Sequence, residues 1–215
     1  MSASIPEIHN RLLHAYGRQY WWPADSPFEV MVGAILTQNT NWKNVELAIA
    51  KLKNANMLDA ERIAACDEAR LSELIRSSGF FNQKAKRLVA FCSFYLDHGR
   101  EAGLLKLENP RQALLALHGI GPETADSMLL YALDIPVFVV DAYTIRIFSR
   151  LGIIRADAVY AETQVLFHKH LQTEAPLFNE YHALIVAHAK RHCHVKPLCV
   201  GCPLLDLCPE GKATH

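Results

Sequence analysis

Residues 117–152, which read LHGIGPETADSMLLYALDIPVFVVDAYTIRIFSRLG, constrain the fold of the chain more than any other stretch. They begin with a tight turn whose two glycines, Gly119 and Gly121, can adopt positive φ without steric cost. A proline and an acid follow at once, as is typical of a helix N-terminus. The short apolar run 137–140 then leads into Asp141 and a second helix. The stretch therefore predicts two helices, a sharp turn before the first and a short extended segment before the second.

Both helix starts have a functional and a structural interpretation. The N–H groups of a glycine turn at a helix start form an anion site that suits a nucleic-acid phosphate, although such a turn is also an ordinary corner in a helical core. Asp141 follows four apolar residues, and a carboxylate there is costly unless it is hydrogen-bonded or used in chemistry. We therefore take the turn as a candidate phosphate-binding site and Asp141 as a candidate functional residue.

Apolar residues recur at helical spacing along most of the chain, and no strand-like alternation extends beyond the run at 137–140. We predict an all-α fold, with a connection rather than a helix over residues 99–109. The predicted helices are 1–16, 27–36, 42–52, 58–65, 67–76, 80–97, one from Pro110, one from Pro122, one after Asp141, 156–170 and 175–192.

Composition narrows the class of protein. A chain of 215 residues can bury a substantial core, and none of its apolar runs has membrane-spanning length. Since no secretory signal is apparent, we expect a cytoplasmic, nucleoid-associated protein. Lys+Arg and Asp+Glu balance at 22 each, so a nucleic-acid contact would use a local basic face. The cluster Lys84, Lys86 and Arg87 near a helix start is one such face, or else a solvated helix surface.

Four cysteines lie close together near the end of the chain, separated by five, two and five residues: Cys193, Cys199, Cys202 and Cys208. Without a secretory signal a disulfide framework is not expected. Zinc more often uses two C-x2-C pairs, of which only one is present here. A single segment that carries four cysteines fits a [4Fe–4S] cluster, which takes four thiolate ligands. We therefore predict these four residues as ligands of an iron–sulfur cluster.

The turn and the acid resemble known motifs. Residues 117–125 read LHGIGPETA and residues 140–144 read VDAYT. They are similar to LPGVGxKTA and VDTHV, the helix-hairpin-helix and catalytic-aspartate motifs of the endonuclease III superfamily of DNA glycosylases. The cysteine loop also resembles that of the superfamily, with a first spacing one residue shorter. The resemblance implies two helical lobes, 24–134 with the hairpin, and 1–23 with 135–215 ending in a [4Fe–4S] loop.

The resemblance also implies site residues. Double-stranded DNA with a damaged base would lie across the cleft between the lobes, with Asp141 as the catalytic residue. Gln38, which could otherwise be a helix C-terminal cap, would fill the gap left by a flipped nucleotide. The implied DNA-binding residues are Gln38, Lys84, Gly119, Gly121 and Thr124.

Four segments point to one branch of that superfamily: WWP at 21–23, TQNT at 37–40, SGFFNQKAKR at 78–87 and GIGPETAD at 119–126. Together they look like the 3-methyladenine DNA glycosylases, in which a glutamate, here Glu123, replaces the lysine nucleophile. Cationic alkylated purines bind aromatic faces, best those of tryptophan. The implied base pocket is Trp21, Trp22, Pro23, Trp42 and Glu123. Structural alternatives are core filling by the tryptophans and helix stabilisation by the acid.

We therefore predict a monomeric, monofunctional DNA N-glycosylase that excises alkylated purines such as 3-methyladenine and has no membrane partner. Two alternatives stay open. One is a bifunctional endonuclease III-like lyase that uses another lysine, such as Lys84. The other is a non-catalytic iron–sulfur protein that binds DNA.

Overall fold

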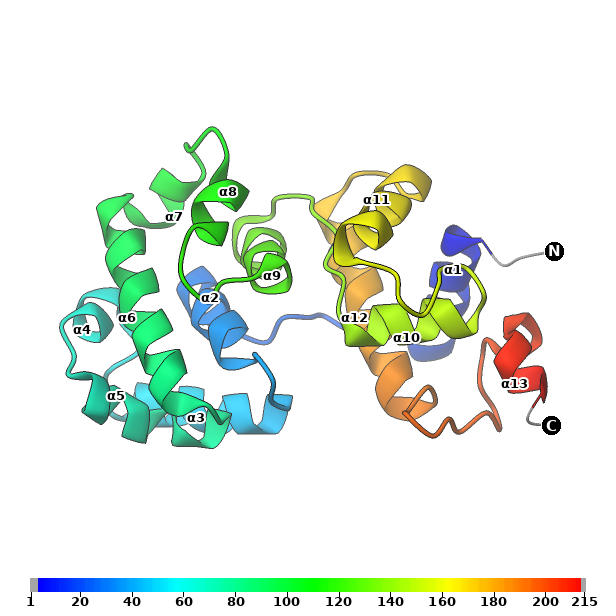
Figure 1. The fold of residues 1–215 in the computed structure, drawn as a ribbon, viewed down its shortest axis with the longest axis horizontal. Coiled ribbons are helices and arrows are strands. Elements are labelled where there is room, and N and C mark those ends of the chain that lie inside the picture. Colours follow the sequence, from blue (N-terminus) through cyan, green and yellow to red (C-terminus); the bar gives the residue numbers. More distant parts are fainter. Residues whose placement is uncertain (1–3, 214–215) are drawn as a thin grey trace. The chain divides into compact units, whose positions relative to one another are not determined.

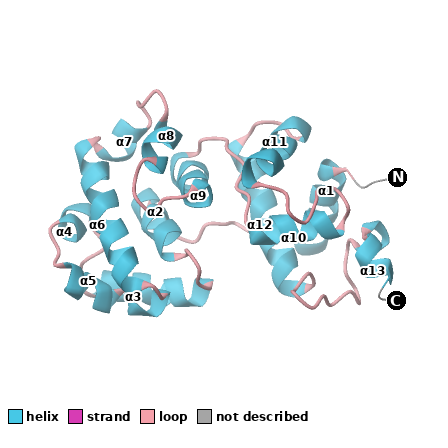
Figure 2. Ribbon diagram, in the orientation of Figure 1, coloured by secondary structure: helices cyan, strands magenta, loops and turns pink. Residues whose placement is uncertain are grey.

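The computed structural model describes residues 4–213, without the side chain of residue 213. Within these residues every regular element is a helix and no strand is present, as Figure 1 and Figure 2 show, so the predicted all-α class is confirmed. None of the described helices is long and apolar enough to span a membrane. The chain divides into an inserted unit, Ala24–Asp134, and a terminal unit made of Met1–Pro23 and Ile135–His215.

Five helices of the inserted unit begin on short polar side chains. Each of these caps accepts a hydrogen bond from the backbone N–H three residues further on, which satisfies a donor that the helix itself leaves unpaired: Ser26, Asn41, Asp59, Asp67 and Asn109. The helices are α2 Pro27–Leu36, α3 Trp42–Asn54, α4 Ala60–Ala64, α5 Glu68–Leu74, α6 Phe81–Asp97, α7 Arg100–Leu104, α8 Pro110–Leu115 and α9 Pro122–Leu133, with a 3-10 turn at Arg76–Ser78.

Two pairings organise the inserted unit. Helix α6 packs against α4 and α5, and α2 packs against α9 (Figure 1). Met31 and Ile35 of α2 and Met128 of α9 are completely buried, since α2 is almost entirely apolar and residues 124–130 of α9 are all buried. The pairing of α2 with α9 brings the end of α2 next to the hairpin turn, although the two are far apart in sequence.

The terminal unit is built around α12. Its helices are α1 Ile5–Tyr16, α10 Ala142–Arg150, α11 Tyr160–His170, α12 Ala175–Arg191 and α13 Pro209–Ala213, with a 3-10 turn at Leu205–Leu207. Helices α1 and α10 pack on α12. The Phe138 ring stacks on Phe167 with centroids 3.9 Å apart, and Tyr181 donates a hydrogen bond of 2.7 Å to the carbonyl oxygen of Ile5. Aromatic rings therefore form one cluster in the core of this unit, whose other buried hydrophobic residues are aliphatic.

The apolar run at 137–140 is not paired in a β-sheet, so its backbone N–H and C=O groups need other hydrogen-bond partners. The N–H of Phe138 donates to His168 Nε2 at 3.1 Å, and Gln164 donates to the carbonyl of Phe138 at 2.6 Å. The N–H of Val140 donates to the Tyr160 hydroxyl at 3.4 Å. Side chains of α11 therefore hold this segment extended and fix the point at which Asp141 begins α10.

Three predicted boundaries need correction. Residues 99–109 contain the short helix α7 rather than a connection alone. Helix α11 begins at Tyr160 instead of residue 156, because the preceding residues form a turn in which the N–H of Ala158 donates to the carbonyl of Arg155. The cysteine loop does not close the chain, since α13 follows it. The first three residues of the predicted helix 1–16 lie outside the described residues.

Candidate functional site

Asp141 is the N-cap of α10. Its Oδ1 atom accepts hydrogen bonds from the backbone N–H of Thr144 at 2.7 Å and from the Thr144 hydroxyl at 2.8 Å. Its Oδ2 atom lies 3.5 Å from Nε2 of His182 on α12. The Asp141 side chain is only 10% exposed, so these partners replace most of its water. The structural interpretation of Asp141 as a cap and the chemical interpretation as a reactive acid are therefore compatible.

The surroundings of Asp141 keep it ionised. Burial raises the pKa of the carboxyl, because the charged form loses water. The hydrogen bond and attraction from His182, together with the two hydrogen bonds from Thr144, outweigh burial and leave the pKa of Asp141 below its ordinary value. An almost buried carboxylate that stays charged near neutral pH can stabilise a developing positive charge or accept a proton.

Sequence reasoning missed two partners of this acid. Thr144 follows Asp141 by three residues, which is the spacing of a capping box, so a local signal was present. His182 lies in a distant helix, and nothing local in the sequence pairs it with Asp141. Only the packing of α12 against α10 brings the two together.

The hairpin turn lies between α8 and α9 in the inserted unit. Gly119 has φ of 83°, in the region that favours glycine, whereas Gly121 is extended with φ of −92°. Of the two glycines that can adopt positive φ, only Gly119 does so in the structure. Glu123 is exposed in the first turn of α9, and Thr124 beside it is buried.

Gln38 follows the end of α2 and contacts the hairpin directly. Its Nε2 atom donates to the carbonyl oxygen of Gly119 at 3.0 Å and to the hydroxyl of Thr124 at 2.9 Å. Its Oε1 atom accepts from Nη1 of Arg87 on α6. Three of the predicted DNA-binding residues, Gln38, Gly119 and Thr124, are thus one connected group, and Arg87 joins them.

Lys84 is not on the basic surface on which its predicted phosphate contact depends. It is 1% exposed, and its Nζ atom donates to the carbonyl oxygens of Leu36 at 2.9 Å and Ser78 at 2.6 Å. Burial, with a smaller contribution from the charge of Arg87, lowers the pKa of Lys84 to about 8. In this structure Lys84 ties the end of α2 to the start of α6, and that part of the sequence prediction is corrected. Lys86 remains exposed.

The tryptophans lie in different units. Trp21 and Trp22 belong to the terminal unit, with ring centroids 5.4 Å apart, and Lys190 Nζ lies 5.9 Å from the Trp21 ring. Trp42 begins α3 of the inserted unit, and its Nε1 atom donates to Glu46 at 2.8 Å. None of the three is fully buried, and Pro23 is exposed. Their joint role with Glu123 in a base pocket stays a prediction.

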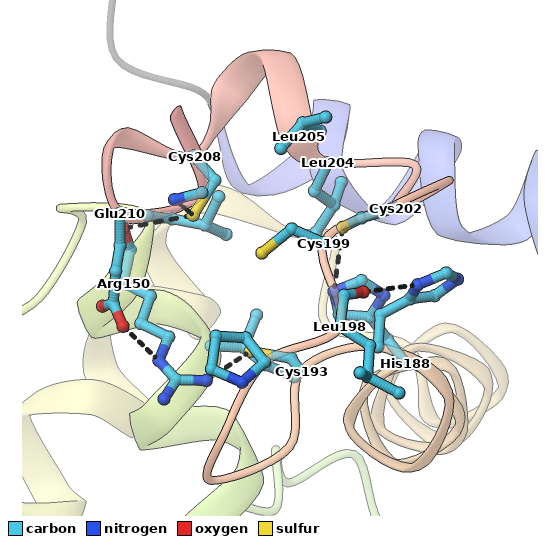
Figure 3. Close-up of a pocket in the computed structure, with 15 residues that line it drawn as sticks. Arg150, His188, Cys193, Leu198, Cys199, Cys202, Leu204, Leu205, Cys208 and Glu210 are labelled. Carbon is cyan, nitrogen blue, oxygen red and sulfur yellow. Dashed lines mark hydrogen bonds and ion pairs between the residues drawn. The ribbon is translucent and has the colours of Figure 1, made fainter. Parts of the chain in front are cut away.

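The four clustered cysteines line one pocket at the end of α12 (Figure 3). Arg150 of α10 holds the loop, because its Nη1 atom lies 3.3 Å from Cys193 Sγ and also donates to the carbonyl of His194 at 2.6 Å. The N–H of Gly211 donates to Cys208 Sγ at 3.3 Å, and Cys202 Sγ lies 3.9 Å from His188 Nε2. The donor set and shared pocket suit a metal centre with thiolate ligands. Within residues 4–213, however, no three potential ligands are close enough to hold one metal ion.

Comparison with known proteins identifies the family. Residues 32–172 match the sequence profile described as HhH-GPD superfamily base excision DNA repair protein. The chain belongs to this superfamily. A relative from Methanocaldococcus jannaschii, provisionally named a DNA repair glycosylase, is 49% identical over 209 residues, or 95% of each chain. Endonuclease III of Sulfolobus acidocaldarius is 32% identical, covering 84% of this chain and 81% of the relative.

Solved structures agree with the family assignment. The H. pylori 3-methyladenine DNA glycosylase, bound to 1,N6-ethenoadenine, is 30% identical with a TM-score of 0.78, covering 88% of this chain and 98% of that one. An endonuclease III in a non-covalent complex with DNA has the same fold, with a TM-score of 0.85 at 24% identity and coverage of 98% and 96%. The resemblance to the endonuclease III superfamily is confirmed, and this HhH-GPD protein is a DNA repair glycosylase.

Proposed function

We propose that this glycosylase binds duplex DNA, flips an alkylated purine out of the helix and hydrolyses its N-glycosidic bond without cleaving the strand. The observation that carries the proposal is Asp141, a nearly buried carboxylate with a lowered pKa at the start of α10. The 30% identity with a 3-methyladenine DNA glycosylase supports the choice of substrate, as do three tryptophans suited to cationic rings.

The proposed reaction assigns each step to a residue. Flipping costs a few kcal/mol and costs least where the base pair is already weakened. The hairpin turn at Gly119 contacts a backbone phosphate, and Gln38 fills the space that the base leaves. Asp141 stabilises the oxocarbenium-like sugar or accepts a proton from the attacking water. An alkylated cationic purine is a good leaving group, so the reaction needs no strong general acid.

The absence of lyase activity is proposed from position 123. A bifunctional glycosylase needs an amine there to form an imine with the sugar, and a carboxylate cannot form that bond. The relatedness to endonuclease III keeps a bifunctional enzyme as the second candidate. The lysine considered for that role, Lys84, is buried with its ammonium donating to two carbonyls, which argues against it.

One experiment tests both parts of the proposal. Methylated duplex DNA is incubated with the protein, the released bases are identified, and borohydride is present in a parallel reaction. We expect free 3-methyladenine, no trapped protein–DNA adduct, and strand breaks only after later heat or alkali. A stable borohydride adduct would instead establish the bifunctional enzyme, and specific DNA binding without base release would establish the non-catalytic alternative.

We also propose that Cys193, Cys199, Cys202 and Cys208 hold a [4Fe–4S] cluster, whose four iron–thiolate bonds would order the C-terminal loop. The shared pocket and the oxygen-free donor set support this. Purified protein should be brown, contain about four iron atoms per chain, and lose both iron and ordering of this loop on Cys202→Ser. A colourless, iron-free protein of unchanged stability would refute the proposal.

A further inference from the structure

The side chain of Gln38 is held in one orientation by its own unit. A primary amide has two N–H donors and one carbonyl acceptor, and here both ends are engaged. The amino group donates to Gly119 at 3.0 Å and to Thr124 at 2.9 Å, whereas the carbonyl oxygen faces the guanidinium of Arg87. The Gly119 carbonyl can only accept and Arg87 can only donate, so together they determine which end of the amide faces the hairpin.

Arg87 also shapes the turn itself. A Cβ atom on residue 119 would lie 2.2 Å from Nε of Arg87, well inside contact distance. Glycine at this position therefore serves two purposes, because it permits φ of 83° and leaves room for the arginine. The Arg87 side chain thus lies directly against the turn that would bind a phosphate, while its end contacts Gln38.

We propose that Arg87 is a positioning residue that couples phosphate binding at the hairpin turn to gap filling by Gln38. A guanidinium presents five N–H donors in a rigid plane, so one arginine can serve a phosphate and an amide oxygen together. Binding of the backbone at the turn then fixes Arg87, and Arg87 fixes Gln38 in the orientation needed beside an extruded base. This inference rests on the proposed function, since it assigns Gln38 to the gap.

The chain offers a matched control. Lys86 is the neighbouring cation on α6 and is exposed, so Lys86→Met removes one positive charge without touching Gln38. Arg87→Met removes the same charge together with the contact to Gln38. Binding is measured to a duplex with one tetrahydrofuran abasic site and to the same duplex without it, at two salt concentrations. The ratio of the two affinities reports gap filling, and the salt dependence reports phosphate contacts.

We expect Lys86→Met to weaken binding to both duplexes equally and to leave the ratio of the two affinities unchanged. Arg87→Met should lower the ratio about tenfold, the size expected for one charge-assisted hydrogen bond. Gln38→Ala should lower it similarly, and the double variant should lower it no further, because the two residues act as a unit. Arg87→Lys keeps the charge without the planar group, so it should restore the salt dependence but not the ratio.

A second readout in the free protein tests the hold of Arg87 on Gln38 separately from the proposed function. The side-chain amide protons of Gln38 should exchange slowly in the wild type and in Lys86→Met, and quickly in Arg87→Met and Arg87→Lys. Unchanged exchange and an unchanged ratio in a folded Arg87→Met, or full restoration of the ratio by Arg87→Lys, would overturn the inference. A wild type that releases no base and shows no preference for the abasic duplex would refute the proposed function instead, and amide exchange would still decide the role of Arg87.

Discussion

Asp126 in the inserted unit and Asp141 in the terminal unit are both largely removed from water, but they are held differently. The side chain of Asp126 has no exposed surface and accepts hydrogen bonds from Nε and Nη2 of Arg111 at 2.6 and 3.0 Å. These hydrogen bonds connect α8 to α9. Asp141 is held by Thr144 and His182. Arginine stays charged at every accessible pH and neutralises its partner, whereas threonine brings no charge to Asp141. If Asp141 acts as we propose, the partner of a buried acid, rather than its burial, separates a structural acid from a reactive one.

The sharpest test of this comparison is Asp141→Asn. Asparagine caps a helix about as well as aspartate, so the variant should fold with little loss of stability. Removing the charge should lower single-turnover base release by at least about 10²–10³-fold, as when one stabilising group is lost from a transition state. Binding to an abasic duplex serves as the control and should survive. Turnover near the wild-type rate would mean that Asp141 is only a cap and that the comparison fails.

A third buried charge, Lys84, tests whether carbonyl partners can substitute for a counter-ion. Its pKa is about 8 in the folded protein and near 10.5 when unfolded, so between these values the unfolded chain binds more protons and stability rises with pH. The free energy of unfolding should gain about 3 kcal/mol from this group across that range.

Denaturant unfolding of the wild type and of Lys84→Met, measured at several pH values, checks the prediction for Lys84. The difference between the two isolates Lys84 from Cys92 and Tyr95, whose pKa values burial raises and which act in the opposite direction. A difference that does not change with pH would show that the Lys84 ammonium is not destabilised by burial.

Asp126→Asn is the counterpart of Asp141→Asn. It keeps the shape of the side chain but leaves Arg111 without its carboxylate, so the free energy of unfolding should fall by about 1–3 kcal/mol. The partial exposure of Arg111 keeps the loss below that of a fully buried pair. Base release per folded molecule should stay unchanged. If the stability held and the rate fell instead, the roles assigned to the two acids would have to be exchanged.

His182→Leu is expected to have the smallest effect at neutral pH. Without the imidazole, only the hydrogen bonds from Thr144 oppose the effect of burial on the pKa of Asp141, so that pKa rises. The acid limb of the rate–pH profile should therefore move to higher pH, with less than about a tenfold change in rate at pH 7. His170→Leu, at an exposed site on α11, should leave the limb in place. If the acid limb of the rate–pH profile did not move in His182→Leu, His182 would have no role in lowering the pKa of Asp141.

Local signals in the sequence predicted much of the fold. The proline and acid after the glycine turn, and the apolar spacing of the long helices, predicted elements that the structure confirms, such as α9 and α2. The same signals gave the hairpin turn and the start of α10, because both depend on residues adjacent in the chain. The short helix α7 was missed because five residues give too little periodicity to recognise.

The partners of the site residues could not be predicted in the same way. His182 reaches Asp141, and Arg87 reaches Gln38, only through helix packing between distant segments. The prediction for Lys84 was wrong because the start of its helix is basic in sequence, which indicated an exposed charged surface. In the structure the ammonium of Lys84 donates to the carbonyls of Leu36 and Ser78, and the side chain is buried. Local sequence shows that a residue is charged, and only the fold shows where its charge is satisfied.

The division of the terminal unit between two distant segments has a consequence for synthesis of the chain. The apolar face of α1, with Ile5, Ile8 and Leu12, is completed by α12, which emerges roughly 160 residues later. At about 5–20 residues per second, α1 waits for roughly 8–30 s beside the ribosome. The residues of Ala24–Asp134 are all available well before that time. The middle of the chain can therefore finish its core while the first helix still lacks its partner.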